Sequence, residues 1–135
     1  MTPFHLKIVT PDGLLYDGEA EKLIVRTVNG EVGILAKHID YVAPLGMGRA
    51  TVQLAGGTRR TAACIGGMLR VGDGQVTLVP TTFEWAEDID TDRADRAQQK
   101  ANSVLHSKDA SDTDLRLAEA KLRRALVRKS VASSK

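Results

Sequence analysis

Residues 87–95, EDIDTDRAD, combine five acidic side chains with one arginine, at the point where a glycine-rich sequence gives way to an alanine-rich one. Asp90 is a typical helix N-cap, and Asp92 favours the first turn of the same helix. Arg93 follows in that turn and carries a guanidinium group that can bind an oxyanion. The stretch therefore predicts a helix start whose residues are also able to hold a ligand.

Two further arginines can complete an anion site with Arg93. Arg124 and Arg128 are four residues apart, so on a helix they share one face. Guanidinium groups bind phosphate oxygens in a bidentate way that ammonium groups cannot match. If the two helical segments fold against each other, Arg93 can join this pair, and the three arginines then suit a phosphate-bearing ligand.

Motifs for catalysis by this chain alone are absent from the sequence. It contains no glycine-rich loop followed by Lys-Ser or Lys-Thr, no Gly-x-Ser-x-Gly, no HExxH and no dinucleotide fingerprint. Because His5, His38 and His106 come from different predicted elements, we expect no metal site. Basic residues of the C-terminal part are interleaved with acids and lack aromatic partners, so nucleic-acid binding is not expected either.

The first 86 residues have the alternating pattern of β-strands. Phe4, Leu6 and Ile8 fall on one face of a strand, and turn residues recur every 8 to 12 positions, which is typical of an all-β sandwich. Pro80 is expected to end its strand or to place it at an edge. The sequence predicts turns at residues 11–13, 56–57 and 72–74.

From about residue 90 the sequence contains neither Gly nor Pro, and the apolar period becomes helical. Two amphipathic helices are predicted, with the polar break HSKDAS at residues 106–111 and Ser111 as the cap of the second helix. Their apolar faces consist largely of alanine, so the seam between them buries little surface and should be weak. The expected domains are a sandwich over 1–86 and a helical hairpin over 87–135.

Composition limits the functional classes further. The 135 residues carry a formal charge of +2, but residues 1–88 have 8 Lys and Arg against 10 Asp and Glu, whereas residues 89–135 have 11 against 7. Cys64 is the single cysteine, which excludes an internal disulfide and favours a reducing compartment with the thiol buried. No stretch approaches the ~20 apolar residues of a membrane span, so a soluble, non-secreted chain is expected.

Three stretches together resemble one family. VTPDG at residues 9–13, NGEVGILAKHIDYVAPL at 29–45 and GGMLRV at 66–71 are similar to the epsilon subunit of bacterial and chloroplast F-type ATP synthases, over about residues 4–132. The resemblance implies a ten-stranded β-sandwich followed by a helical hairpin. It also implies a non-catalytic rotor subunit at the cytoplasmic face of the bacterial inner membrane, with the chloroplast stroma as the alternative.

The resemblance further implies partners for the sandwich. In the family, the sandwich binds the gamma subunit and rests on the ring of c subunits, and the GEVGIL loop lies near that ring. The expected ring contacts in this chain are Glu31, Val32, Gly33, Ile34, Leu35 and His38. Ala36 and Asp40-Tyr41 replace two common prolines, which predicts a looser loop.

For the hairpin, the resemblance implies regulation. Ile89-Asp90-Thr91-Asp92-Arg93-Ala94 is similar to the IDxxRA motif of epsilon subunits that bind ATP. No cofactor is expected to be required, but ATP is expected as a regulatory ligand. Its expected contacts are Glu84, Ile89, Asp90, Arg93, Ala94, Arg124 and Arg128, with the two acids at the base or ribose and the arginines at the phosphates. Leu117 stands where ATP-binding relatives often have arginine, which predicts weaker binding.

The implied mechanism has two states of the hairpin. Folded down it permits rotation, and extended along gamma it places its basic residues among the alpha and beta subunits, where it inhibits ATP hydrolysis. The alternative function is a stand-alone β-sandwich interaction module with a helical tail that docks on a partner.

Overall fold

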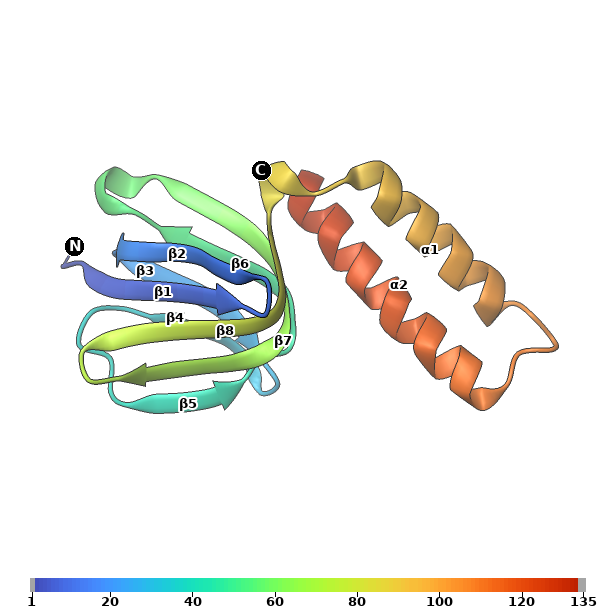
Figure 1. The fold of residues 1–135 in the computed structure, drawn as a ribbon, viewed down its shortest axis with the longest axis horizontal. Coiled ribbons are helices and arrows are strands. Elements are labelled where there is room, and N and C mark those ends of the chain that lie inside the picture. The colour runs from blue at the N-terminus through green and yellow to red at the C-terminus, as the bar shows by residue number, and fades with distance from the viewer. Residues whose placement is uncertain (1, 134–135) are drawn as a thin grey trace. The chain divides into compact units, whose positions relative to one another are not determined.

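A computed structural model describes residues 2–133 and contains two compact units, Met1–Trp85 and Ala86–Lys135. The first unit is a β-sandwich and the second is a helical hairpin, so the fold class expected from the sequence is confirmed (Figure 1). The division between the units falls after Trp85, one residue before the boundary expected between residues 86 and 87.

Eight strands form the sandwich within the described residues. They belong to one hydrogen-bonded sheet that folds over on itself, in the order β2-β1-β8-β7-β6-β3-β4, with β5 added beside β7 (Figure 1). The strands are β1 Phe4–Thr10, β2 Gly13–Ala20, β3 Lys22–Thr27, β4 Gly30–Ile34, β5 Tyr41–Pro44, β6 Met47–Gln53, β7 Arg59–Gly72 and β8 Gln75–Trp85.

Two long strands explain why eight are present where the sequence predicted about ten. The first half of β7 pairs with β6 and its second half pairs with β5, so one continuous strand occupies the positions of two shorter strands. Gly66 and Gly67 lie between the halves with φ values of 68° and 101°, a backbone conformation that favours glycine. The chain makes no turn where β7 changes its partner strand, so the sequence contains no turn signal that would predict the change.

Pro80 corrects a second expectation. It does not end a strand, because β8 continues through it to Trp85, and its ring is buried. Pro80 lies opposite Gly67 in the ladder, where the two strands bend together.

Alternation of apolar and polar residues builds the core as predicted. Leu6 and Ile8 are fully buried, whereas His5 and Lys7, which alternate with them, are exposed and partly exposed. In the turns that connect β1 to β2 and β3 to β4, a threonine hydroxyl accepts a hydrogen bond from the backbone amide two residues later. Thr10 Oγ1 accepts a hydrogen bond from the Asp12 amide at 3.2 Å, and Thr27 Oγ1 accepts one from the Asn29 amide at 3.1 Å. These buried hydroxyls hold the tight turns that fix strand register.

An aromatic cluster closes the end of β8. The Trp85 ring meets the Phe83 ring edge to face at a centroid distance of 4.9 Å, and the Arg60 guanidinium carbon lies 3.7 Å from the Trp85 ring centroid. Tyr16 contacts the other edge of Trp85 at 6.5 Å. Burial raises the pKa of the Tyr16 hydroxyl, and the nearby Arg60 charge opposes that rise. The last residue of the sandwich is therefore held by packing on several sides.

The second unit consists of the short turn η2 Ala86–Asp88, helix α1 Thr91–Leu105 and helix α2 Asp112–Ser133. The predicted break at residues 106–111 is confirmed. Asp90 caps α1 by accepting the Arg93 amide at 3.0 Å. Ser111 and Asp114 cap α2 reciprocally, through an amide-to-hydroxyl bond of 3.1 Å and an amide-to-carboxylate bond of 3.2 Å.

Small residues form the seam between α1 and α2. Ala94 and Ala101 on α1 and Ala118 and Ala125 on α2 are buried, each pair being spaced seven residues apart. A polar contact adds to this seam, because Lys129 Nζ lies 2.8 Å from Asp95 Oδ1 and donates to Gln98 Oε1 at 2.7 Å. Alanine methyls allow the helices to approach closely but bury little apolar area, so the seam contributes modest stability.

Candidate functional site

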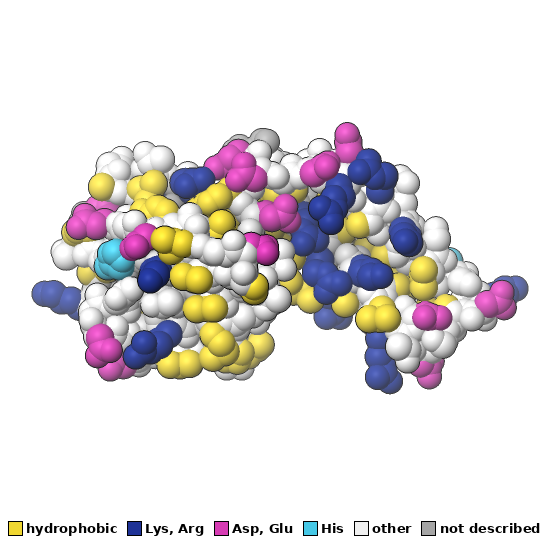
Figure 2. Space-filling model, viewed as in Figure 1, with side chains coloured by type: hydrophobic (Ala, Val, Ile, Leu, Met, Phe, Trp, Pro, Cys, Tyr) yellow, Lys and Arg dark blue, Asp and Glu magenta, His cyan; other side chains and the backbone are white. Residues whose placement is uncertain are grey.

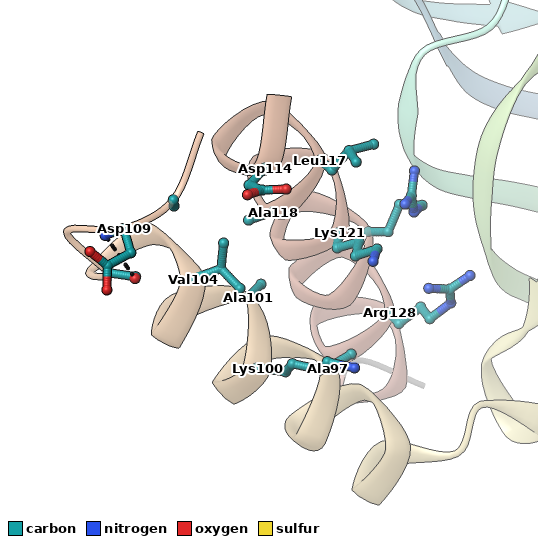
Figure 3. A pocket seen from close by; sticks show the side chains of 13 residues that line it. Ala97, Lys100, Ala101, Val104, Asp109, Asp114, Leu117, Ala118, Lys121 and Arg128 are labelled. Carbon is teal, nitrogen blue, oxygen red and sulfur yellow. Dashed lines mark hydrogen bonds between the residues drawn. The ribbon is translucent and has the colours of Figure 1, made fainter. Parts of the chain in front are cut away.

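A groove runs along one side of the hairpin, between α1 and α2 (Figure 3). It has a volume of about 540 Å³, which is large enough for a nucleotide-sized molecule. Its floor is apolar and comes from both helices. The floor residues are Ala97, Ala101, Val104, Leu117 and Ala118. We refer to this feature as the hairpin groove.

Charges are separated along the hairpin groove. Four cationic side chains line it, Lys100 from α1 and Lys121, Arg124 and Arg128 from α2. Figure 3 shows Arg128, Lys100 and Ala97 toward one end, and two carboxylates, Asp109 and Asp114, at the opposite end beside the interhelical loop. The arrangement favours an anionic group in the basic part and disfavours one near the loop.

The residues of the IDxxRA-like stretch lie at the start of α1. Ile89 and Ala94 are buried and Asp90 and Arg93 are exposed. One carboxylate oxygen of Asp90 accepts the Arg93 amide, which leaves the second oxygen available to another donor. The capping interpretation of Asp90 is therefore confirmed, and it is compatible with a ligand contact by the same side chain.

The hairpin groove collects two of the seven residues expected to contact ATP, Arg124 and Arg128. Ile89, Asp90, Arg93 and Ala94 belong to the same unit but do not line the groove, and Glu84 is a partly buried residue of β8 in the sandwich. The ATP contacts stay a prediction. Lys100 and Lys121 were missed, although the three- and four-residue spacing of Lys121, Arg124 and Arg128 was visible in the sequence.

Four of the six residues expected to contact the c ring, Glu31, Val32, Gly33 and Ile34, lie in β4, and Leu35 and His38 lie in the loop that follows it. Of these, Ile34 is fully buried in the core, so it supports the loop from within, whereas the Leu35 side chain is 47% exposed. His38 Nδ1 lies 2.8 Å from the Ile39 carbonyl oxygen, and its ring meets Tyr41 edge to face at 5.8 Å. Lys37 has a φ of 63°, which turns the chain sharply at this point.

The same loop exposes a residue that the sequence analysis did not select. Ile39 is 77% exposed, and with Leu35 it gives the loop an apolar surface. Lys37 and Asp40 flank this surface, and a small cavity of about 50 Å³ separates the loop from the β7–β8 turn. An apolar centre with a charged rim is the usual composition of a small protein contact.

A row of apolar side chains crosses the outer face of the sandwich over five adjacent strands. Pro44 on β5 lies opposite Met68 on β7, and Met68 lies opposite Val79 on β8. Val9 on β1 and Val79 on β8 come directly after the paired residues Ile8 and Leu78. Val9 in turn lies opposite Leu14 on β2. Met68, Val79 and Leu14 are 42%, 43% and 56% exposed. Figure 2 shows hydrophobic side chains gathered on this face, and we call the five residues the outer apolar row.

Polar residues border the outer apolar row on one side. Lys7 pairs with Asp17 on β2 and with Thr77 on β8, and Thr77 pairs with Arg70 on β7. Contiguous exposed apolar side chains with a polar border mark an interaction site more often than scattered ones do. The face therefore has the composition of a protein interface.

Among residues 2–133 no candidate metal site, membrane-spanning helix or reactive thiol is found. No cluster of three or more His, Cys, Asp or Glu side chains in this range could hold a metal ion. No helix in the described part of the chain has the length and apolar character needed to cross a membrane. Cys64 is buried as expected, and burial raises the pKa of its thiol to about 12.

Comparison with protein families divides the chain within one residue of the place where its structure does. Residues 3–86 match the model of the ATP synthase delta/epsilon chain beta-sandwich domain, and residues 87–133 match that of the delta/epsilon chain long alpha-helix domain. Both matches follow chain order and together span nearly every residue.

Curated relatives agree over their full length. The chain is 39% identical to the ATP synthase epsilon chain of Halalkalibacterium halodurans, with 98% of both chains covered. It is 42% identical to that of Bacillus velezensis, with 99% of this chain and 100% of the relative covered. The Ruminococcus albus protein of the same description is 38% identical, with both chains fully covered.

Solved structures extend the similarity of fold. A chain of the Euglena gracilis mitochondrial ATP synthase, in a complex described as OSCP/F1/c-ring, superposes with a TM-score of 0.84 at 23% identity, covering 100% of this chain and 83% of that one. A chain of the Tetrahymena thermophila central stalk and c ring gives 0.65 at 11% identity, with 95% of each chain covered. At these identities the comparison shows the fold alone.

Proposed function

Since the chain belongs to the ATP synthase delta/epsilon chain family, we propose that its sandwich attaches it to the rotor and that its hairpin regulates the complex. The chain is an epsilon subunit of the F-type ATP synthase and is itself non-catalytic. The observation that carries the proposal is the separation of an interface-like sandwich from a weakly seamed, basic hairpin.

The outer apolar row is the proposed binding surface for the gamma subunit. It presents Pro44, Met68, Val79, Val9 and Leu14 as one continuous strip with a charged border. Burial of such a strip stabilises a complex by about 25 cal/mol for each Å² of apolar surface removed from water. Rigid strands hold the strip in place, so binding requires little ordering of the backbone.

The segment of residues 31–40, which comprises most of β4 and the loop after it, is the proposed contact with the c ring. Leu35 and Ile39 supply its exposed apolar surface, and Glu31, Lys37 and His38 supply polar groups around it. Such a mixed surface suits a contact that must be specific without being large. With such contacts the chain would lie at the membrane-facing end of the catalytic sector, which we propose is the cytoplasmic side in a bacterium.

The hairpin is the proposed regulator. Its alanine seam and half-exposed Lys129–Asp95 pair hold the helices together weakly, so opening costs little. The excess of positive charge in residues 89–135 favours contact with acidic surfaces of the alpha and beta subunits in the extended state, which inhibits hydrolysis. ATP bound only to the closed hairpin would stabilise it by about 2.7 kcal/mol at a hundredfold excess over its dissociation constant.

Binding to isolated gamma subunit tests the first half of the proposal. Met68→Glu places a charge in the middle of the outer apolar row, and we expect at least about tenfold weaker binding because the carboxylate would be desolvated in the interface. Val28→Glu is a matched control, because Val28 is 60% exposed but lies on the β3–β4 turn outside the row. Equal effects of the two changes would remove the row as the gamma surface.

Removal of residues 89–135 tests the second half. The sandwich has its own core, so the shortened chain should fold and assemble. We expect the complex that contains it to hydrolyse ATP faster than the complex with the full chain. An unchanged hydrolysis rate, with the shortened chain present in stoichiometric amount, would leave the hairpin without an inhibitory role.

A further inference from the structure

Met68 combines a central position in the outer apolar row with a side chain that can be chemically modified. It is 42% exposed, and the residues opposite it, Pro44 and Val79, have side chains of carbon and hydrogen only. We propose that Met68 is a redox modification site, at which hydrogen peroxide converts the thioether to a sulfoxide and so weakens binding of the free chain to the gamma subunit. The inference rests on the proposed function of the row and adds a regulation to it.

Exposure favours this sulfur over the others within residues 2–133. Cys64 is 3% exposed, and burial raises the pKa of its thiol to about 12, so little of the reactive thiolate forms near neutral pH. Met47 is partly buried on β6, where it lies opposite the buried Ile65. In the described part of the chain, Met68 is therefore the sulfur that a peroxide in solution reaches most readily.

The strand around Met68 keeps its side chain on the outer face. Gly67, the residue before it, packs against the carbonyl oxygen of Val79, so the backbone is held in place there. Leu69, the residue after it, is fully buried in the core. Because successive residues of a strand point to opposite faces, Met68 cannot turn into the core without a change of register.

The oxidation needs no catalytic group from the protein. A lone pair of the Met68 sulfur attacks one oxygen of hydrogen peroxide, the O–O bond breaks, and the other oxygen leaves as water after proton transfer. The sulfur gains an S–O bond and is oxidised, while the peroxide is reduced. Methionine sulfoxide reductases reverse the change: a pair of thiols is oxidised to a disulfide, and the oxygen leaves as water. The modification is therefore reversible.

The sulfoxide should affect binding much more than folding. In the free chain its oxygen lies at the surface and can be hydrated, and Met68 does not belong to the core of the sandwich. An apolar interface would remove that hydration without supplying a partner, which is unfavourable for a polar group. We expect about tenfold or greater loss of affinity for gamma. Gamma that is already bound would cover the sulfur, so the modification acts on chains that have not yet assembled.

Peroxide treatment followed by binding to isolated gamma subunit tests the inference. Peptide mass spectrometry measures the sulfoxide at Met47 and at Met68, in the free chain and in the chain bound to gamma. We expect Met68 to be oxidised first in the free chain and to be protected in the complex. The oxidised chain should bind gamma at least about tenfold more weakly while its unfolding temperature stays within a few degrees. Treatment with methionine sulfoxide reductase should restore the affinity.

Two variants separate Met68 from the other methionine of the sandwich. Met47→Leu should lose affinity on peroxide treatment to the same extent as the unaltered chain. Met68→Leu has no sulfur at this position, so peroxide should not change the affinity for gamma that this variant has before treatment.

The remaining outcomes each contradict one claim. If the oxidised and the untreated chain bind gamma equally, or if Met68→Leu is as sensitive to peroxide as the unaltered chain, Met68 is not the modification site although gamma binding stands. Oxidation of Met68 at the same rate in the free chain and in the complex would show that gamma does not cover it. If the untreated chain does not bind gamma, the proposed role of the outer apolar row fails and this inference fails with it.

Discussion

Gly67 is a residue at which backbone conformation and packing both exclude a side chain. Its φ is 101°, and an added Cβ would lie 2.1 Å from the Val79 carbonyl oxygen and 2.6 Å from the Pro80 Cα. Gly74 also has a positive φ, 72°, but no atom lies within 4 Å of its added Cβ. A substitution at Gly74 therefore tests backbone strain alone, whereas a substitution at Gly67 tests strain and steric overlap together.

We predict that Gly67→Ala lowers the free energy of unfolding by at least about 3 kcal/mol, because strain and overlap add at this position. Gly74→Ala should cost about 1–2 kcal/mol, from strain alone. Urea denaturation followed by tryptophan emission measures both. Similar losses at the two positions would contradict the role assigned to the bend between β7 and β8.

Cys64 gives a prediction about pH. The pKa of its buried thiol is raised to about 12 from the ordinary 9.0, so the folded chain keeps the proton while the unfolded chain releases it above pH 9. The stability that comes from the neutral thiol is fully present below pH 9 and declines as the pH rises toward 12. We expect Cys64→Ala to show a shallower decline over that range, and the native thiol to resist alkylation at pH 8 until the protein is unfolded. Rapid alkylation of the folded protein would contradict this.

Single residues were predicted well where a local rule applied. Alternation was enough to place Leu6 and Ile8 in the core, the usual interior location of free cysteine was enough to bury Cys64, and cap preferences were enough to find Asp90 and Ser111. Those rules depend only on neighbours in the sequence.

Pro80 was misjudged because its position depends on a partner strand. A proline is tolerated inside β8 only because Gly67 opposes it at a bend, and the pairing of these two residues is not visible in either segment alone.

At the scale of elements, Lys129 on α2 forms a polar link to Asp95 and Gln98 on α1. The Lys129 and Asp95 side chains are 40% and 48% exposed, so water screens the pair. We predict that Lys129→Ala lowers hairpin stability by about 0.5–1 kcal/mol, and that a double-mutant cycle with Asp95→Asn gives a coupling of about 0.5 kcal/mol. Thermal loss of helical circular dichroism measures both.

A loop lysine provides the control for that cycle. Lys108 is exposed in the interhelical loop, and its replacement by alanine should change the helical transition very little. If Lys108→Ala is as destabilising as Lys129→Ala, the effect of Lys129 is one of overall charge and not of its contact with α1.

The extent of each helix was predictable, but the hairpin groove was not. The period of 3.6 and the polar break at 106–111 are local, and they placed α1 and α2 correctly. Which residues face each other across the seam depends on the relative shift of the helices, which packing and the Lys129 contact determine. For this reason Arg124 and Arg128 were selected from their own spacing, while Lys100 and Lys121 became candidates only when both helices were seen together.

At the scale of the whole molecule, the two units differ in how they are stabilised. The sandwich core consists of large side chains such as Leu6, Leu23, Leu69 and Leu78, all fully buried. The hairpin relies on alanines, each of which buries fewer methylene groups, at roughly 0.8 kcal/mol for every group that is absent. A regulator that opens while its anchor stays bound requires this imbalance.

Separate unfolding transitions are the last prediction, and the single tryptophan makes them measurable. Trp85 belongs to the sandwich and is 7% exposed, whereas most of the helical signal comes from α1 and α2. We expect the helical signal to be lost at a lower temperature than tryptophan burial, because the weak seam melts before the sandwich core. A chain that ends at Asp88 should keep the tryptophan transition within a few degrees, since Phe83, Tyr16 and Arg60 still surround the ring. Coincident transitions in the full chain, or loss of tryptophan burial in the shortened one, would mean that hairpin and sandwich form one cooperative unit, and a hairpin that opens by itself would then be excluded.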